Sequence, residues 1–387
     1  MYVHGRTSRW NQTVYDPHVN LLRATTETMS AALGACDAFT VLPFDFARSP
    51  DATDDLGARL ARNTQQVIKH EAYLDKVVDP AAGSYYLETL TDRIAKEGWA
   101  LFQEIESAGG YLKAFANMGP SPSDSGRAIG LIQARVKASA DRSRQAVASR
   151  KQTVLGTNQY PNGKERASDS IKTPADRPLP APGGAARMPA AGVAGDEQAA
   201  LAWIRGLPAI ASKHGVGAVI ADLRGAPDLK VEALQSFRAA DEFEALRLAT
   251  EARVAGGKAA PKVFLIGYGD LAMRKARSMF AANFFTCAGY EIIDSAGDDS
   301  IDGASAGARA ALQAGADIVV FCSSDAEYDQ AVDAAKIVRA AGAARVVIAG
   351  NPADHVDALR AAGVQHFIHA RSNALAELQG FHKELGV

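Results

Sequence analysis

The stretch Lys262-Val-Phe-Leu-Ile-Gly267 is the first of five short apolar runs that decide how the last third of this 387-residue chain folds. Each run is too short for a helix and rich in β-branched residues, so each predicts a buried strand. The other runs are Tyr290-Glu-Ile-Ile293, Asp317-Ile-Val-Val-Phe-Cys322, Arg345-Val-Val-Ile-Ala-Gly350 and His366-Phe-Ile-His369. They begin 28, 27, 28 and 21 residues apart, with an alanine-rich amphipathic segment in each gap. This alternation predicts a doubly wound parallel sheet.

Ligands of such a sheet bind at the carboxyl ends of the strands, so the loop after the first strand is a candidate site. It reads Gly267-Tyr-Gly-Asp-Leu-Ala-Met-Arg-Lys-Ala-Arg277 and contains an aspartate but no histidine. Asp270 stands just before the next helix, where an aspartate commonly caps backbone N–H groups. Cys322-Ser-Ser-Asp325, after the third strand, has no histidine nearby in sequence to activate a nucleophile, which favours a structural role.

Residues 1–160 predict a mainly helical region, 161–200 a flexible linker, 201–255 a helical lead-in and 256–387 the sheet domain. Helical apolar spacing occurs at 21–33, 56–68, 86–105 and 129–147, and Ala38-Phe-Thr-Val-Leu42 is the chief strand candidate of the first region. The linker is rich in Pro, Gly, Ala and Ser, and its apolar residues define no buried face. The lead-in contains a candidate helix at 199–204 and a candidate strand at 217–222.

Composition excludes several classes of protein. An apolar content of 47% suffices for packed cores, yet no run of about 18 apolar residues that would cross a membrane occurs. The net charge is -2 and no basic cluster is large, so nucleic acid is not an expected partner. Three widely spaced cysteines indicate neither a disulfide framework nor a zinc site. The N-terminus lacks the apolar core of a secretory signal, so we expect a cytoplasmic protein with no metal site.

Four segments of the first half resemble the last portion of the substrate barrel of coenzyme B12-dependent acyl-CoA mutases. They are Asp16-Pro-His-Val-Asn-Leu-Leu-Arg-Ala-Thr-Thr-Glu-Thr-Met-Ser-Ala-Ala-Leu-Gly34, Ala61-Arg-Asn-Thr-Gln65, Asp79-Pro-Ala-Ala-Gly-Ser-Tyr-Tyr-Leu-Glu88 and Gly156-Thr-Asn-Gln-Tyr160. In the second half, residues 280–291, 322–328 and 367–373 resemble the small, non-catalytic subunits of the methylmalonyl-CoA mutase family. The resemblance implies the C-terminal portion of a (β/α)8 barrel followed by a flavodoxin-like, cobalamin-binding-type sheet.

The resemblance also shows which cofactor contacts differ. Catalytic members carry Asp-x-His-x-x-Gly after the first strand of the sheet, and the imidazole is the lower ligand of cobalt. Here Met273 or Arg274 occupies the histidine position, and neither side chain replaces imidazole as a ligand. Ser323 and Ser324 follow the third strand, beside which the cofactor's base lies in the family. The paired glycines after the fourth strand appear as Ala349-Gly350, and His369-Ala-Arg-Ser-Asn373 replaces Gly-Pro-Gly.

We therefore expect no catalytic residue and no cofactor contact in this chain, and treat Asp270, Met273, Arg274, Ser323, Ser324 and Gly350 as degenerate positions of the cobalamin site. The barrel half agrees, because Tyr2-Val-His-Gly-Arg-Thr-Ser-Arg-Trp10 keeps only part of the family's substrate-side motif. Its His4 is a candidate substrate contact, although a lone histidine is more often structural. Thr40-Val-Leu-Pro-Phe-Asp-Phe46 replaces the run that faces the corrin and keeps only Asp45. The turn at 79–86 is expected to start a helix with its tyrosines packed.

A barrel of this kind needs eight strands and roughly 250 residues, whereas the chain supplies two or three β/α units. An incomplete barrel leaves strand edges open, so the sequence implies a missing piece. A shortened N-terminus, a split gene, or structure borrowed from a partner would each account for it. We expect residues 1–160 not to fold alone.

The function implied by the resemblance is support of a catalytic large subunit, in a heterodimer that interconverts methylmalonyl-CoA and succinyl-CoA. Adenosylcobalamin is expected in that partner and not in this chain. The alternative is a cobalamin carrier or sensor that binds the cofactor with its own base attached. Whether the chain itself is an enzyme stays open at this point.

Overall fold

The computed structural model describes residues 2–48, 55–77, 79–111, 114, 130–167, 234, 236–295, 303–342 and 345–387. The described residues form two compact units. One unit holds those within 1–84, 139–173 and 236–387, and the other holds those within 85–138 and 174–235. The candidate helix at 199–204, the candidate strand at 217–222 and most of the expected linker lie outside the described residues.

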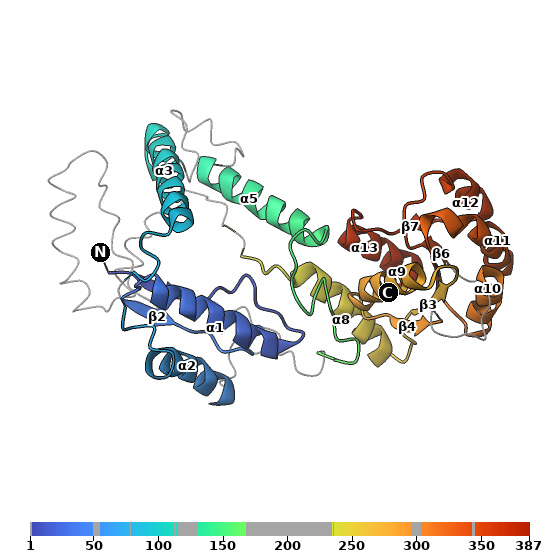
Figure 1. Ribbon diagram of the computed structural model, residues 1–387, viewed down its shortest axis with the longest axis horizontal. Helices are drawn as coiled ribbons and strands as arrows, with labels where there is room; N and C mark the ends of the chain where they lie inside the picture. The colour runs from blue at the N-terminus through green and yellow to red at the C-terminus, as the bar shows by residue number, and fades with distance from the viewer. Residues whose placement is uncertain are drawn as a thin grey trace, which may run out of the picture. The chain divides into compact units, whose positions relative to one another are not determined.

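The C-terminal third contains a five-stranded parallel sheet, as the five apolar runs predicted (Figure 1). Its strands are β3 (Lys262–Gly267), β4 (Glu291–Asp294), β5 (Ile318–Cys322), β6 (Arg345–Ile348) and β7 (His366–Phe367). The order across the sheet is β4-β3-β5-β6-β7. The chain therefore places β4 on one side of β3 and then β5, β6 and β7 on the other side. Such a change of side opens a crevice at the carboxyl ends of the central strands, which is where ligands of parallel sheets bind.

Helices cover both faces of this sheet. Alternate residues of β3 enter different cores: Val263 and Leu265 join one cluster, and Phe264 and Ile266 join the other. The first cluster includes residues of α9 (Leu271–Thr286) and α13 (Ala374–Leu385). The second includes residues of α10 (Ala304–Gln313), α11 (Ala331–Ala341) and α12 (Val356–Ala362). Burial on both faces explains why the sequences of the central strands β3, β5 and β6 are almost continuously apolar, whereas the edge strands β4 and β7 include charged or polar residues.

The N-terminal region contains one strand-helix-strand unit. β1 (His4–Arg6) and β2 (Ala38–Thr40) pair in parallel, and α1 (Pro17–Leu33) connects them. α2 (Asp55–His70) follows, so the helices expected at 21–33 and 56–68 and the strand expected at 38–42 are confirmed. Within the part of the chain that the structure describes, β1 and β2 have no other strand beside them.

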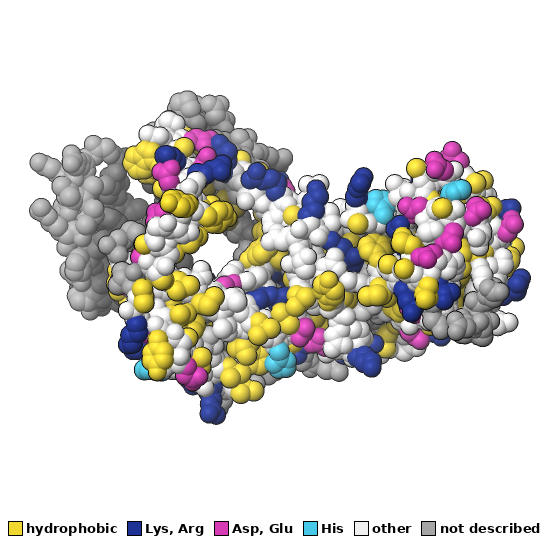
Figure 2. Space-filling model, in the orientation of Figure 1, with side chains coloured by type: hydrophobic (Ala, Val, Ile, Leu, Met, Phe, Trp, Pro, Cys, Tyr) yellow, Lys and Arg dark blue, Asp and Glu magenta, His cyan; other side chains and the backbone are white. Residues whose placement is uncertain are grey.

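α3 (Tyr85–Ser107) and α5 (Leu131–Ala148) confirm the two other helices expected in the first region. The turn at 79–84 leads into α3 as predicted, but the expectation that its tyrosines pack was wrong. Tyr85 is 92% exposed and Tyr86 is 73% exposed. Leu87, Leu90, Ile94, Trp99, Leu101 and Phe102 are also exposed, and Figure 2 shows hydrophobic side chains at the surface over α3. The sequence pattern identified the helix correctly but not its surroundings.

α8 (Asp241–Ala255) lies in the predicted lead-in and joins the first core cluster through Phe243 and Leu246. Across the described ranges, no helix is both long and apolar enough to span a membrane. The three cysteines are free; Cys287 and Cys322 are buried, and Cys36 is half-buried.

Candidate functional site

The carboxyl edge of the five-stranded sheet is organised around the carboxylate of Glu327, in the 3-10 helix η2 (Asp325–Gln330). The hydroxyls of Ser323 and Ser324 lie 2.7 and 2.6 Å from Glu327 Oε2 and donate to it. The backbone N–H of Asp270 donates to Oε1 at 3.2 Å, from the loop that follows β3. The loops after β3 and β5 are therefore joined through one acidic side chain.

These hydrogen bonds determine the charge of the cluster. The hydroxyls of Ser324 and Ser323 lower the pKa of the Glu327 carboxyl, because they stabilise its ionised form. A carboxylate with a lowered pKa is a poor general base near neutral pH, so it does not activate either serine as a nucleophile. The arrangement is suited to holding loops together.

Tyr328 fills the space between the ends of β5 and β6. Its side chain is fully buried, and its hydroxyl donates to Ala349 O at 2.8 Å and accepts from Ser323 N at 3.3 Å. A Cβ added to Gly350 would lie 2.9 Å from Asp325 Oδ1 and 3.0 Å from the Tyr328 ring. The side chains of Asp325 and Tyr328 thus occupy the space next to Gly350.

Gly269 makes a similar close approach. Its φ is +73°, and a Cβ there would meet the carboxylate of Glu327. Glycine is therefore required both by the left-handed backbone and by the packing of Glu327 over the loop. Arg277 Nη2 and Asp325 Oδ1, 2.9 Å apart, add an ion pair between α9 and η2.

The structure brings most of the expected degenerate positions together. Asp270 caps α9 as predicted, since its Oδ1 accepts from Met273 N at 2.9 Å. Met273 is 37% exposed, and Arg274 is half-buried, with its Nε lacking a hydrogen-bond partner among the described groups. Cys322, just before the serines, is buried, and burial raises the pKa of its thiol to about 12, so the thiolate that a nucleophile needs does not form.

His4 lies apart from this cluster, on the two-stranded sheet. It is exposed, and its Nε2 is 2.9 Å from Thr40 Oγ1 on β2. A cross-strand contact of this kind helps to hold two short strands together.

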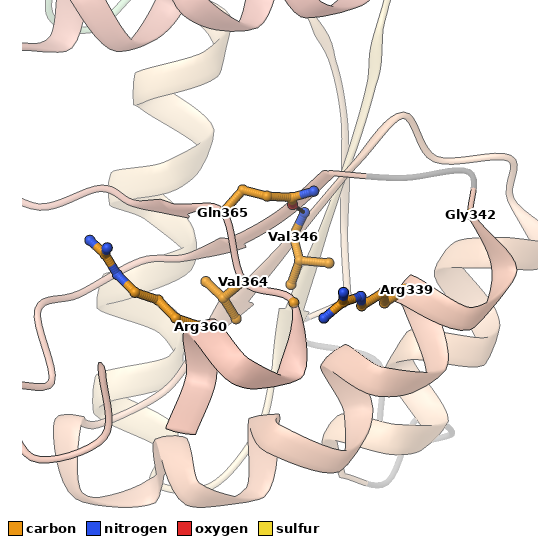
Figure 3. Close-up of a pocket in the computed structure, with 7 residues that line it drawn as sticks. Arg339, Gly342, Val346, Arg360, Val364 and Gln365 are labelled. Atoms are coloured by element: carbon orange, nitrogen blue, oxygen red, sulfur yellow. Dashed lines mark hydrogen bonds between the residues drawn. The ribbon is translucent and has the colours of Figure 1, made fainter. Parts of the chain in front are cut away.

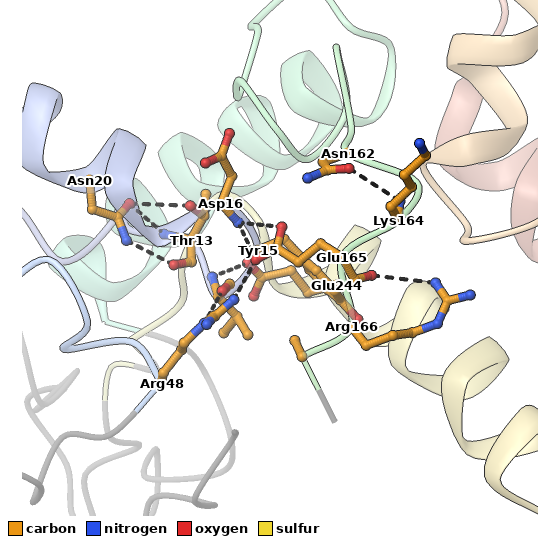
Figure 4. A network of polar contacts seen from close by, with 12 residues as sticks. Thr13, Tyr15, Asp16, Asn20, Arg48, Asn162, Lys164, Glu165, Arg166 and Glu244 are labelled. Atoms are coloured by element: carbon orange, nitrogen blue, oxygen red, sulfur yellow. Dashed lines mark hydrogen bonds and ion pairs between the residues drawn. The ribbon is translucent and has the colours of Figure 1, made fainter. Parts of the chain in front are cut away.

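A second group of polar side chains ties the N-terminal region to α8 (Figure 4). Glu244 is 2% exposed and accepts hydrogen bonds from Val14 N and Arg238 Nη2, both at 2.6 Å. Burial raises the pKa of the Glu244 carboxyl, against the opposing effect of Arg238. The hydroxyl of Tyr15 donates to Glu251 Oε1 at 3.0 Å.

Arg247 extends this network to residues 162–167. Its guanidinium is buried 3.9 Å from the centroid of the Tyr15 ring, and Nη2 donates to Asn162 O at 2.5 Å and Glu165 O at 2.7 Å. Glu165 in turn accepts from Asp16 N and pairs with Arg48 at 2.5 Å. Because Tyr15, Glu244 and Arg247 are each at most 2% exposed, this network supports the fold and offers no surface to a ligand.

Sequence reasoning missed Glu327, Tyr328 and the charged face of α8. The first had a usable signal, because Ser324-x-x-Glu327 directly after a buried strand is the pattern of a capping box. Glu244, Arg247 and Glu251 recur at helical spacing among apolar residues, which also indicated a buried polar face. Tyr328 had no such signal, since its role depends on the distance between two strands that are far apart in sequence.

Comparison with known proteins agrees with this architecture. The sequence profile described as "Methylmalonyl-CoA mutase" matches residues 1–178. A methylmalonyl-CoA mutase small subunit of Porphyromonas gingivalis is 41% identical over 100% of this chain and 52% of its own length. A small subunit of Streptomyces virginiae is 31% identical over 86% of this chain and 42% of its own length.

A methylmalonyl-CoA mutase of Escherichia coli is 35% identical over 44% of this chain and 22% of its own length. This chain spans about half the length, or less, of the curated relatives it matches. The profile covers the N-terminal region, and the similarity to the P. gingivalis small subunit extends through the five-stranded sheet. The chain belongs to the methylmalonyl-CoA mutase family.

Proposed function

We propose that this chain is a small-subunit-like component of a methylmalonyl-CoA mutase. In this role it supports a separate catalytic subunit that interconverts methylmalonyl-CoA and succinyl-CoA with adenosylcobalamin. The small-subunit names of the P. gingivalis and S. virginiae relatives support the assignment, as does identity over the whole chain to the former. The chain itself contributes no catalytic residue in this proposal.

The observation that carries the proposal is the closed carboxyl edge of the sheet. In a parallel sheet this edge is where a ligand would enter, yet here Glu327 and Tyr328 join the loops that would have to make room for it. The side chains of Ser323, Ser324, Glu327 and Tyr328 at this edge already have protein partners. A ligand would have to displace those bonds and leave buried groups unsatisfied, which costs about 1–3 kcal/mol for each group.

The residues present do not fit cobalamin. The position of the cobalt ligand offers Met273 or Arg274, and a permanently charged guanidinium cannot coordinate a metal. The fully buried ring of Tyr328 occupies the gap between the ends of β5 and β6, beside which the cofactor's base would lie. We therefore derive no step of the reaction through this chain and assign the cofactor to the partner. On the same grounds Asp270, Met273, Arg274, Ser323, Ser324 and Gly350 are proposed as structural, and His4 as a strand contact.

The finer architecture belongs to the same proposal. We interpret β1, α1, β2 and α2 as β/α units of a partial (β/α)8 barrel within residues 1–160, and residues 256–387 as a flavodoxin-like domain of the cobalamin-binding type. The order β4-β3-β5-β6-β7 supports the second assignment. The linker at 161–200, the lead-in at 201–255, the cytoplasmic location, the absence of nucleic acid or membrane partners and the heterodimeric stoichiometry remain predictions.

The test is reconstitution with a large subunit that carries Asp-x-His-x-x-Gly. We expect the two chains to copurify in equal amounts and to isomerise methylmalonyl-CoA with added adenosylcobalamin, whereas this chain alone does not. Replacing the cobalt-ligand histidine of the large subunit by alanine should abolish the activity of the pair. The matched substitutions Met273→Ala and Arg274→Ala in this chain should leave that activity unchanged.

Isomerisation by this chain alone would contradict the proposal, and so would loss of the pair's activity in the Met273→Ala variant. Titration of the chain with cobalamin distinguishes the proposed supporting role from the role of a cobalamin carrier or sensor. We expect the visible spectrum to stay unchanged, and a shift that saturates at one cofactor per chain would assign the binding role to this chain.

A further inference from the structure

A depression of about 430 Å³ opens at the opposite, amino edge of the five-stranded sheet (Figure 3). Val346 of β6 and Val364, before β7, form its apolar base. Gly342 and Gly363, the C-cap residues of α11 and α12, also line it. Its remaining lining residues are Arg339, Arg360 and Gln365, so no carboxylate lines it. The volume lies in the range of small-molecule sites, and the two charged side chains that line the depression are both arginines.

Arg339 is held in place by its packing. Its side chain lies against Gly363, where an added Cβ would approach Arg339 Cδ to 2.6 Å, so a larger residue there would displace the arginine. Gly363 also has a φ of +110°, which favours glycine independently. One guanidinium nitrogen, Nη1, donates to Ala361 O at 3.3 Å. Arg339 is exposed, so its guanidinium is accessible to solvent.

Gln365 adds a further donor, whereas the Arg360 side chain extends away from Arg339 (Figure 3). The Arg360 guanidinium lies 5.8 Å from the centroid of the Phe367 ring, on the other side of the depression from Arg339 (Figure 3). Gln365 Oε1 accepts from Val346 N at 2.7 Å, which leaves the amide NH₂ of Gln365 as a donor. Among the described residues neither Arg339 nor Arg360 forms an ion pair.

We propose that this depression binds the phosphate group of a small phosphorylated molecule. The fork of a guanidinium matches the oxygens of a phosphate, and Arg339, which has no carboxylate partner among the described residues, keeps its charge available for it. Val346 and Val364 would contact the uncharged part of the ligand. Free phosphate and a nucleoside monophosphate share the recognised group, and the apolar base favours the larger molecule.

Isothermal titration calorimetry of the full chain tests this with adenosine 5′-monophosphate, inorganic phosphate and adenosine. We expect both phosphates to bind at one site and adenosine not to bind. Tighter binding of the nucleotide identifies a phosphate attached to an organic body, and equal binding identifies free phosphate. Arg339→Gln should weaken phosphate binding about tenfold. Arg339→Lys, which keeps the charge but loses the fork, should weaken it less.

Arg309→Gln is the matched control, because Arg309 is exposed on α10 and does not line the depression. Its affinity should equal that of the unmodified chain. The proposal is overturned if neither phosphate binds, if Arg339→Gln binds as tightly as the unmodified chain while its melting temperature is unchanged, or if the control weakens binding equally. A melting temperature lowered by Arg339→Gln without a change in affinity would show that the arginine serves only the helix ends.

Discussion

At the scale of single residues, Tyr328 has the largest consequence for the candidate site. Its hydroxyl links the ends of two strands, and its ring is in the core below α11. Burial raises the pKa of this phenol, so it stays protonated and remains a donor at every physiological pH. A side chain of this kind closes a crevice and stabilises the sheet at the same time.

Tyr328→Phe removes only the hydroxyl and leaves Ala349 O and Ser323 N without that partner. We expect the free energy of unfolding to fall by about 1–2 kcal/mol, because buried backbone groups lose a hydrogen bond. Urea unfolding followed by circular dichroism measures the change. Tyr160→Phe is the control, since Tyr160 is 71% exposed, and its effect should stay below about 0.5 kcal/mol. Equal effects of both substitutions would mean that the Tyr328 hydroxyl does not hold the strands.

His382 makes the stability of the chain depend on pH. It is buried on α13, its ring stacks on Tyr290 at 5.5 Å, and burial lowers its pKa to about 4. The unfolded chain, with a histidine pKa of about 6.5, binds more protons between these values. Stability from this residue is therefore fully present above pH 6.5 and is lost as the pH falls towards 4, by up to about 3 kcal/mol.

Unfolding free energies measured between pH 4 and pH 8 test this. His382→Phe keeps the aromatic stacking but cannot be protonated, so we expect its stability to decrease less on acidification. His70→Gln, at an exposed position at the end of α2, should follow the unmodified chain. If His382→Phe and the unmodified chain lose the same stability between pH 6.5 and pH 4, the histidine is not the cause.

At the scale of elements, most helices and strands were predictable and their surroundings were not. The five apolar runs identified β3 to β7, and the signal was strongest for β3, β5 and β6, because strands buried on both faces need continuous apolar sequence. α3 shows the limit, since its helical spacing was recognised but its tyrosines are exposed. Periodicity reports which face of a helix is apolar and does not report what lies against that face.

The start of α9 gives a prediction at this scale. Asp270→Ala removes the acceptor for Met273 N, so one N–H of the first turn loses its partner. We expect a loss of about 1 kcal/mol in the free energy of unfolding, and a much smaller loss for Asp270→Asn, which also caps helices. Chemical denaturation is the measurement, with Asp354→Ala as the control at an exposed, non-capping position. A loss as large for Asp270→Asn as for Asp270→Ala would argue against capping.

At the scale of the whole molecule, α8 connects the N-terminal region to the five-stranded sheet within one compact unit. Phe243 and Leu246 pack in the sheet's core, whereas Glu244 and Glu251 bind residues 14, 15 and 167. The buried carboxylates Glu244 and Glu251 accept hydrogen bonds from residues 14 and 15, which only the N-terminal segment supplies. The folding of the two regions is therefore coupled.

Glu244→Ala tests that coupling. It leaves Val14 N without its buried acceptor, whereas Arg238 keeps its ion pair with Asp241, so we expect a loss of about 1–3 kcal/mol. Glu242→Ala, on the exposed side of the same helix, should cost less than about 0.5 kcal/mol. Thermal unfolding of the full chain compares the two. Similar melting temperatures for both variants would show that the buried carboxylate contributes little.

Residues 1–160 in isolation should not unfold cooperatively. Val14, Tyr15 and Arg48 would lose Glu244, Glu251 and Glu165, and the pair β1–β2 has only three residue pairs of its own. Scanning calorimetry of this fragment, beside the full chain, is the measurement. A sharp heat-capacity peak from the fragment would show that the N-terminal region folds without α8.

The sequence by itself determined the parallel sheet, the helices that flank it, the family and the lack of a histidine in the loop that follows β3. These properties follow from local periodicity and from the identity of single residues. Only the tertiary structure decided that Glu327 and Tyr328 close the carboxyl edge, that α8 holds the N-terminal segment through buried charges, and that Arg339 lies against Gly363. Each depends on groups brought together from distant parts of the chain, and a linear pattern does not encode the distance between them.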